Sequence, residues 1–236
     1  MAAITVVLLV FISAPYGRHT RSGWGPVMPA RWAWILMESP AVLLYCTVFF
    51  LGDHRFELVP LLLLGLWQVH YLHRTFIFPF RMRSSGKTVP LLIPALALFF
   101  NSLNAWINAR WISHLSAYES SWLLDPRFLI GAGVFVVGLV INMHSDTVLL
   151  RLRKPGETDY KIPHGAMFRL VSSPNYLGEL IVWAGWAMAT WSWAGLAFFV
   201  YTAANLGPRA VQNHRWYQQT FPDYPPKRRI LVPFIF

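Results

Sequence analysis

The chain has 236 residues, of which 56% are hydrophobic and only 13% charged, and its mean hydropathy is +0.43. A soluble domain carries about a quarter of its residues as charged side chains, so this composition argues against a soluble globular protein. The net charge of +10 comes from basic residues that lie between apolar runs, so membrane topology explains it first and we expect no nucleic acid partner.

Seven apolar runs are candidate membrane spans, since a bilayer core of about 30 Å needs roughly 20 residues of helix. They are 2–14, 33–51, 58–73, 89–109, 128–149, 171–190 and 194–207. The first run lacks a basic segment before it and a clear cleavage site after it, so we interpret it as a short helix and not as a signal peptide. The sixth run is interrupted by the polar stretch Ser172-Ser173-Pro174-Asn175.

The basic residues alternate between the segments that separate these runs. The segments 15–32, 52–57, 74–88, 110–127, 150–170, the turn after the sixth run and the tail hold 3, 1, 4, 2, 5, 0 and 5 of them. Alternate segments therefore hold 17 of the 20, which predicts an N-terminus outside and a C-terminus in the cytosol. We predict an all-α, seven-helix, multi-pass membrane protein, a monomer of one domain (1–236), in a bacterial inner membrane or the endoplasmic reticulum.

Two polar side chains lie within apolar runs of the N-terminal half. Glu38 lies about five residues inside the second run, roughly 7 Å from its cytosolic end. An ionisable residue inside a span suggests function, although a pairing with an arginine that fixes helix packing is the alternative. Tyr71 ends the third run on the cytosolic side, where an interfacial anchor is the simpler interpretation of this residue by itself.

The last three runs each end on the cytosolic side in polar residues spaced four apart, which share one helix face. These sets are Asn142 with Asp146, Asn175 with Glu179, and Arg209 with Asn213 and Tyr217. Together with the basic residues of the segment 151–161 they describe one large polar site, with ordinary helix-end solvation as the alternative. Basic side chains bind phosphates, and side-chain amides and carboxylates bind ribose hydroxyls or an amide group. NADPH carries all of these groups, so the pattern favours NADPH.

Other motifs are missing from the sequence or have simpler interpretations. No G-x-G-x-x-G follows a strand, which excludes a Rossmann domain, and no G-x-S-x-G nucleophile motif occurs. The glycines of 131–138 are interpreted as small residues for close helix packing. His70 and His73 flank Tyr71, but their spacing is not convincing for a metal, and we predict none.

The chain resembles the steroid 5α-reductase family in stretches that occur in order and cover most of its length. The similarity is strongest from Asn142 onward, in 141–146 (INMHSD), 152–156 (LRKPG), 160–163 (YKIP), 172–179 (SSPNYLGE), 223–225 (DYP) and 230–236 (ILVPFIF). It extends to the N-terminal half through 16–20 (YGRHT), 29–31 (PAR) with Glu38, and 69–75 (VHYLHRT).

The resemblance implies NADPH as cofactor and reduction of the Δ4 double bond of a 3-oxo steroid to a 5α-dihydrosteroid, with hydride delivered to C5. It implies that Glu38 and Tyr71 hold the 3-keto oxygen, that residues about 1–110 face the substrate, and that residues about 128–236 bind NADPH. The implied NADPH-pocket residues are Asn142, Asp146, Arg153, Tyr160, Lys161, Asn175, Glu179, Arg209 and Tyr217. Mammalian members carry a Gln where this chain has Met37, and a run of His where it has Gln212-Asn213-His214.

Other functions fit parts of the pattern. A membrane reductase of a polyprenol or an enoyl thioester is the nearest alternative, but Glu38 favours a ketone that can be polarised. An S-adenosylmethionine-dependent membrane methyltransferase is a second, but the basic cluster 151–161 favours a ligand that bears phosphates. A small proton-coupled transporter is a third, in which Glu38 would be the proton or cation site.

Overall fold

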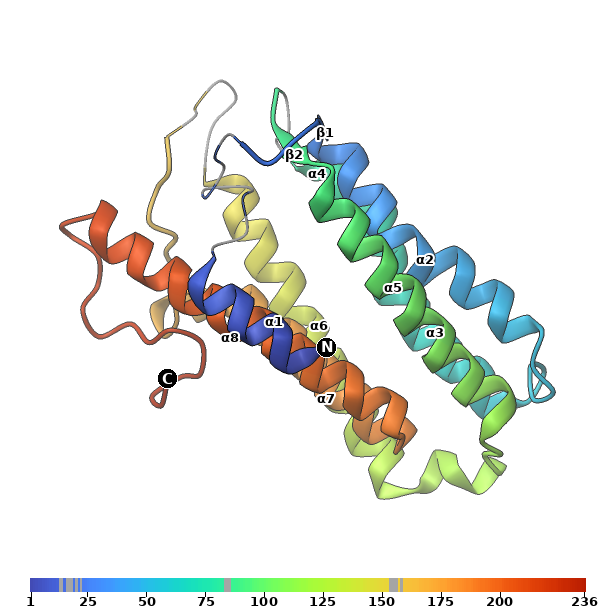
Figure 1. Ribbon diagram of the computed structural model, residues 1–236. Helices are drawn as coiled ribbons and strands as arrows, with labels where there is room; N and C mark the ends of the chain where they lie inside the picture. The colour runs from blue at the N-terminus through green and yellow to red at the C-terminus, as the bar shows by residue number, and fades with distance from the viewer. Residues whose placement is uncertain are drawn as a thin grey trace. The chain divides into compact units, whose positions relative to one another are not determined.

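The structure is a computed structural model that describes residues 1–12, 15, 19, 21, 23–82, 86–152, 157 and 159–236. Most of the described backbone is helical (Figure 1). The α-helices are α1 (Ala2–Phe11), α2 (Ala30–Phe50), α3 (Leu58–Leu72), α4 (Phe78–Arg81), α5 (Leu92–Arg110), α6 (Pro126–Arg151), α7 (Pro174–Thr190) and α8 (Trp193–Thr220). The shorter elements are the π-turns η2 (His73–Ile77) and η3 (Trp111–Leu115), the 3-10 turns η4 (Ser120–Leu124) and η5 (Ala166–Arg169), and the strands β1 (Val27–Pro29) and β2 (Thr88–Pro90).

Three helical segments are long and apolar enough to cross a membrane. They are α2, α5 with η3 (Leu92–Leu115), and α6, while α1 is apolar but shorter. Large apolar side chains on these segments are exposed: Leu43 is 61%, Phe99 64% and Val140 61% accessible. Such surface is unfavourable in water, so the chain is a helical membrane protein. Each of the seven expected runs falls on a helix, and the number of crossings stays a prediction.

A two-stranded ribbon corrects the all-α expectation. β1 pairs antiparallel with β2, with Val27 opposite Pro90 and Pro29 opposite Thr88. A proline restricts the residue before it to extended conformations, which favours strands at these two places. α2 follows β1 and α5 follows β2, so both helices begin at the ribbon.

The boundaries of the last two helices also differ from the expected runs. α7 begins at Pro174 and not at 171, because proline suits the first turn of a helix, where no N–H is needed. Val171 instead forms a parallel bridge with Arg229 in the C-terminal segment. α8 continues to Thr220, well past the expected end at 207, and it contains Pro208. The extension agrees with the spacing of Arg209, Asn213 and Tyr217, which had been interpreted as one helix face.

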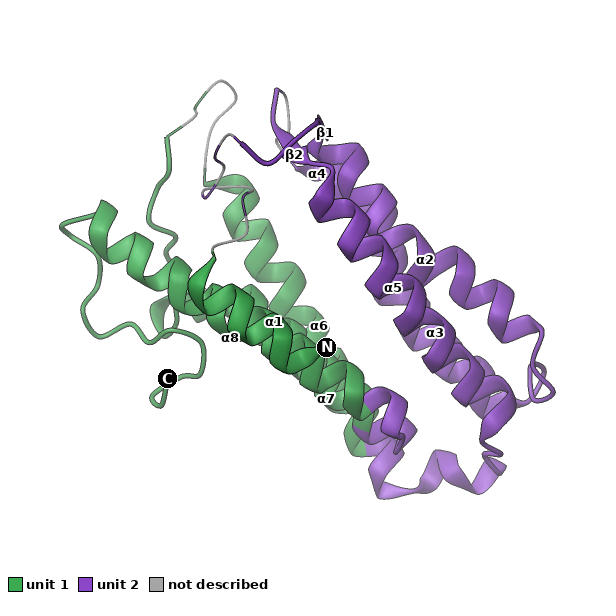
Figure 2. Ribbon diagram, viewed as in Figure 1, with its two compact units in different colours: residues 1–13, 130–187, 196–236 green, residues 14–129, 188–195 purple. Residues whose placement is uncertain are grey.

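The chain falls into two compact units (Figure 2). Unit 1 holds residues 1–13, 130–187 and 196–236, and it contains α1, most of α6 and α7, nearly all of α8, and the C-terminal segment. Unit 2 holds residues 14–129 and 188–195, and it contains the ribbon with α2, α3 and α5.

In unit 1, the backbones of α6 and α7 touch at glycines. A Cβ on Gly138 would lie 2.4 Å from the backbone nitrogen of Val182, and one on Gly178 would lie 2.5 Å from that of Asn142. Real Cβ atoms are essentially never that close to another atom, so only glycine permits this approach. The expected role of Gly138 in close packing is confirmed.

A third close contact lies one level further along the same helix pair. A Cβ on Gly185 would lie 2.4 Å from the backbone nitrogen of Phe135 and 2.7 Å from the carbonyl oxygen of Gly131. Gly131 therefore also takes part in the close packing. The same expectation is wrong for Gly133, where an added Cβ meets nothing within 4 Å.

Replacing Gly138 by Ala tests this contact. We expect G138A to lower the free energy of unfolding by about 1–3 kcal/mol, because the added methyl forces the two helices apart. G133A is the matched control on the same helix and is expected to leave the melting temperature unchanged or to raise it, since Ala has the higher helix propensity. Equal melting temperatures for both variants in detergent would contradict the backbone contact.

Candidate active site

The close approach of α6 and α7 brings four of the expected cofactor residues together in unit 1. The Asn142 side-chain amide donates to the Asn175 carbonyl oxygen (3.0 Å) and to Glu179 Oε1 (3.3 Å). The Asn175 side-chain amide donates to Asp146 Oδ1 (3.2 Å). Each bond joins one helix to the other, so the four side chains form one polar network.

This network is buried. Asn142, Asp146 and Glu179 are 1%, 4% and 8% exposed, and the Trp183 indole donates to Glu179 Oε2 at 3.1 Å. Among the described residues, Asn142 Oδ1 is a buried acceptor that has no hydrogen-bond partner. A buried polar atom without a partner costs free energy, so this oxygen is suited to an N–H or O–H donor of a ligand.

Two further expected residues lie in a series of aromatic rings in unit 1. The Tyr160 ring packs edge-on against Trp216 with centroids 5.1 Å apart, and Trp216 contacts Tyr217 at 5.2 Å. Tyr217, 3% exposed, stacks on Tyr224 with centroids 5.2 Å apart and an interplanar angle of 9°. The series joins the segment before η5, helix α8 and the C-terminal segment.

Of the three expected basic residues, the structure describes two, Lys161 and Arg209. The Arg209 guanidinium lies 5.5 Å from the centroid of the Tyr176 ring, in a contact between α8 and α7. Lys161 is exposed and forms an ion pair with Glu157. Arg153 lies outside the described residues.

A serine, a histidine and a tyrosine form a second polar cluster, which the sequence interpretation missed. Ser172 Oγ lies 2.6 Å from both His214 Nδ1 and the Tyr224 hydroxyl, and it donates to the Arg229 carbonyl oxygen at 3.1 Å. The cluster ties the residues before α7 to α8 and to the C-terminal segment. The signal in the sequence was the SSPN stretch, which had been interpreted as an interruption of an apolar run and as part of the family resemblance, without a role for Ser172.

Arg228 is a further residue that the sequence interpretation missed as a site residue. It is 4% exposed, it stacks on Tyr224 at 4.9 Å, and its Nε and Nη1 atoms have no partner among the described residues. A buried guanidinium without a counter-charge is strongly unfavourable, so this position suits an anion such as a phosphate. The residue had been counted only as one of the basic residues of the tail.

In unit 2, two indole hydrogen bonds fix the height of Glu38 on α2 relative to Tyr71 on α3, measured along the helix axes. The Trp34 indole of α2 donates to the Arg74 carbonyl oxygen (3.0 Å), and the Trp67 indole of α3 donates to the Ala41 carbonyl oxygen (2.8 Å). Glu38 is one turn from both bonds along α2, and Tyr71 is one turn from both along α3. The helices run antiparallel, so the two residues lie at one level on neighbouring helices.

The backbone around this pair departs from a regular α-helix on both sides. Pro40 cannot donate to the Leu36 carbonyl, and the Ser39 hydroxyl donates to it instead at 3.0 Å. The π-turn η2 begins two residues after Tyr71, and π-turns inside helices are frequent at functional sites. Tyr71 is 3% exposed and packs on the Trp67 ring with centroids 4.9 Å apart.

The fold and the site define a helical membrane protein with buried polar side chains that are suited to a phosphate-bearing ligand. The chain belongs to the 3-oxo-5-alpha-steroid 4-dehydrogenase family, which matches residues 87–236. It is 48% identical over 239 residues to the steroid 5-alpha-reductase DET2 of Arabidopsis thaliana, covering 98% of this chain and 91% of the relative. It is 43% identical to the 3-oxo-5-alpha-steroid 4-dehydrogenase 1 of Bos taurus (100% and 93%) and 42% to that of Homo sapiens (94% and 86%).

Membership of this family makes the chain an oxidoreductase that acts on a CH–CH bond. The family resemblance seen in the sequence is thereby confirmed. The individual roles of the site residues stay predictions.

The His214 cluster predicts a dependence of stability on pH. Burial and, to a smaller extent, the nearby Arg228 cation lower the pKa of His214, which lies beyond the expected last span. A histidine with a lowered pKa favours folding above its unfolded value of about 6.5, and this contribution is lost as the pH falls through the folded pKa. The melting temperature is therefore expected to decrease between about pH 7 and pH 5.

H214Q should remove part of that decrease, since Gln does not titrate. H164Q, which changes an exposed histidine in the segment before η5, is the control and should keep the full decrease. The account of His214 fails if H214Q and the unchanged protein lose melting temperature equally on acidification.

Proposed function

We propose that this protein reduces the 4,5 double bond of a 3-oxo steroid with NADPH and gives the 5α product. The observation that carries the proposal is the placement of Glu38 and Tyr71 at one level of the α2–α3 pair. A carboxyl group and a phenol at one level can both hydrogen-bond to the carbonyl oxygen of a ketone. An allylic alcohol has no carbonyl oxygen to polarise. The relatives are named as a steroid 5-alpha-reductase and a 3-oxo-5-alpha-steroid 4-dehydrogenase, which supports a steroid as the substrate.

The residues of unit 1 suit NADPH. The Asn142 Oδ1 atom accepts a hydrogen bond from an amide N–H or a ribose hydroxyl, and the Arg228 guanidinium pairs with a phosphate. NADPH bound there supplies the hydride that reduces C5 of the steroid. Asp146, Glu179 and Tyr217 are proposed to line the same pocket, together with Asn175, Tyr160, Lys161, Arg209 and Arg153.

Two residues of unit 2, Glu38 and Tyr71, are proposed to act on the 3-keto oxygen of the enone. Negative charge develops on the 3-keto oxygen as C5 is reduced, and a hydrogen-bond donor already aimed at this oxygen stabilises the transition state. The Tyr71 hydroxyl is the proposed donor. Glu38 either donates as the neutral acid or orients Tyr71. The proton that completes the reaction at C4 comes from water.

The membrane arrangement follows from the positions of the basic residues. We propose seven crossings with the N-terminus outside, in which α3 is extended by η2 and α4, and in which the polar ends of α6, α7 and α8 face the cytosol. A steroid dissolved in the bilayer then reaches unit 2 from the lipid, while NADPH reaches unit 1 from the cytosol.

The first experiment is NADPH oxidation by detergent-purified protein with progesterone, testosterone and a polyprenol in parallel. Steroid products two mass units heavier than the substrates, with no product from the polyprenol, are the expected result. NADPH oxidation with the polyprenol alone would replace the steroid by an isoprenoid alcohol as the substrate.

Removing the Tyr71 hydroxyl tests the proposed donor. We expect Y71F to reduce kcat by about 100-fold or more, as loss of a donor to a developing oxyanion does elsewhere, while the Kd for NADPH stays unchanged. Y45F is the matched control, because Tyr45 stacks on the same Trp67 ring from α2 and has no role in the proposed chemistry. Normal turnover by Y71F would exclude the Tyr71 hydroxyl from the reaction.

Replacing Arg228 is expected to weaken NADPH binding and to stabilise the protein without cofactor. R228Q is expected to raise the Kd for NADPH roughly ten- to a hundredfold, because a charge-assisted hydrogen bond contributes about 1.5–3 kcal/mol. Without cofactor the same variant is expected to melt at a higher temperature, since it removes a buried unpaired charge. R229Q, at the exposed neighbouring position, should change neither value. An unchanged Kd for R228Q would exclude Arg228 from the cofactor pocket.

A further inference from the structure

Three asparagines follow one another along α5 in unit 2, within a candidate membrane span. Asn101, Asn104 and Asn108 are spaced three and four residues apart, so they lie on one side of the helix. Polar side chains inside a membrane span are unfavourable unless they have partners, and they suggest function. The sequence interpretation gave these three residues no role.

The outer two asparagines have hydrogen-bond acceptors, whereas the middle one does not. The Asn101 side-chain amide donates to the Met37 carbonyl oxygen of α2 at 2.6 Å. The Asn108 side-chain amide donates to the Asn104 carbonyl oxygen at 3.1 Å and to Asn104 Oδ1 at 2.9 Å. Asn104 is 6% exposed, and within the described part of the chain its Nδ2 atom is buried without a hydrogen-bond acceptor.

The hydrogen bond from Asn108 fixes the orientation of the Asn104 amide group. Because Asn104 Oδ1 accepts this bond, Nδ2 is the end of the amide that stays unused. A buried N–H group without an acceptor costs free energy, so it is suited to an oxygen atom of a ligand. A donor that is already held in place also loses little conformational freedom when the ligand binds.

The bond between Asn101 and Met37 relates the level of Asn104 to that of Glu38. α2 and α5 both begin at the ribbon and run in the same direction. Asn104 is three residues beyond Asn101 and Glu38 is one residue beyond Met37, so their levels differ by only about 3 Å along the helices. Since Tyr71 lies at the level of Glu38 on α3, three helices bring a carboxyl group, a phenol and an unused amide N–H to one level of unit 2.

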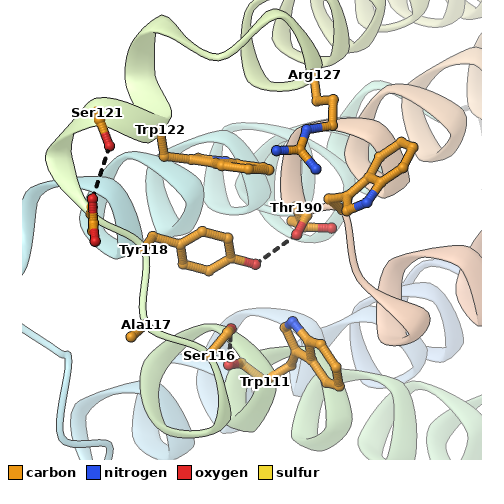
Figure 3. Close-up of a pocket in the computed structure, with 10 residues that line it drawn as sticks. Trp111, Ser116, Ala117, Tyr118, Ser121, Trp122, Arg127 and Thr190 are labelled. Carbon is orange, nitrogen blue, oxygen red and sulfur yellow. Dashed lines mark hydrogen bonds between the residues drawn. The ribbon is translucent and has the colours of Figure 1, made fainter.

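The far end of α5 is also held, so the register of α5 against α2 is fixed at both ends. The backbone N–H of His54, beyond α2, donates to the Ser113 carbonyl oxygen in η3 at 2.8 Å. The Ser116 hydroxyl donates to the Trp111 carbonyl oxygen at 2.6 Å (Figure 3). The cavity of about 360 Å³ in this figure begins at Trp111, about 10 Å of helix beyond Asn104, and is therefore a separate feature.

We infer that Asn104 Nδ2 is a second hydrogen-bond donor to the 3-keto oxygen of the steroid, an inference that rests on the proposed function. A carbonyl oxygen has two lone pairs, so it accepts from the Tyr71 hydroxyl and from the Asn104 amide at the same time. Negative charge develops on this oxygen as C5 is reduced, and a second preorganised donor stabilises that charge further. Asn104 is therefore assigned to the catalytic site together with Tyr71 and Glu38.

Replacing Asn104 by Leu removes the donor and keeps a side chain of similar size. N104L is expected to lower kcat roughly 10- to 100-fold, because a donor to a developing oxyanion acts mainly in the transition state. The Kd for NADPH should stay unchanged. Without steroid, N104L is expected to melt at the same or a higher temperature, since the buried unpaired N–H is gone and Asn108 still donates to the backbone carbonyl of residue 104.

N101L is the matched control on the same helix. It removes a hydrogen bond between α5 and α2, so it is expected to melt at a lower temperature than the unchanged protein. The direction of the change in melting temperature therefore separates an asparagine that holds the fold from one that is kept for a ligand.

Two substrates identify the oxygen atom that Asn104 contacts. Progesterone carries a second ketone on its D-ring side chain, whereas androst-4-en-3-one has the 3-keto oxygen alone. N104L should lower kcat for both steroids by the same factor. A loss with progesterone alone would place Asn104 at the opposite end of the steroid and overturn the inference.

Two other results would also overturn it. Normal kcat for N104L with both steroids would exclude Asn104 from the reaction. A melting temperature of N104L lowered as in N101L, with kcat normal per folded molecule, would assign Asn104 a structural role only. Activity of the unchanged protein is measured first: if it reduces neither steroid, the proposed function itself fails and the inference fails with it.

Discussion

The contact between the backbones of α6 and α7 is the constraint on which the proposed cofactor pocket depends. Apolar side chains alone do not bring two helices together in a bilayer, because the lipid is as apolar as they are. Glycines let the main chains touch, and Gly178 lies directly against Asn142. At that distance the Asn142 amide reaches both the backbone and a side chain of α7. A wider helix separation would leave these polar groups buried without partners.

In unit 2, tryptophans hold neighbouring segments together. The indoles of Trp34, Trp67 and Trp122 each donate to a backbone carbonyl of another segment. A large ring fills apolar space while its single N–H fixes the register, so packing and orientation come from one residue. Two of these indoles, Trp34 and Trp67, hold the α2–α3 pair at the level of Glu38 and Tyr71.

The sequence predicted features that depend on residues close together in the chain. It missed features that depend on contacts between distant segments. The residues of the α6–α7 network were found because their spacing of four is local, and a shared helix face follows from it. The β1–β2 ribbon joins segments far apart in the chain, and only its prolines hinted at it. Arg228 was missed because its burial arises from the fold of the C-terminal segment over α7 and α8, and a basic residue in a tail has no local sign of burial. Arg209 contacts the Tyr176 ring and Lys161 pairs with Glu157, and their expected role in cofactor binding stays a prediction.

Among the described residues of unit 1, the buried side-chain atoms without a hydrogen-bond partner belong to Asn142 and Arg228 alone, so these two residues carry information. Asn142 Oδ1 is an unused acceptor and Arg228 an unused donor, in a unit where neighbouring polar atoms have partners. A chain under selection for stability alone would not keep a buried, unpaired guanidinium. A ligand that binds only the folded protein offsets this cost in proportion to the logarithm of its concentration over Kd. The C-terminal segment, which carries Arg228 and Tyr224, is therefore best stabilised when an anion is bound, and the stability of unit 1 is coupled to its proposed cofactor through this one side chain.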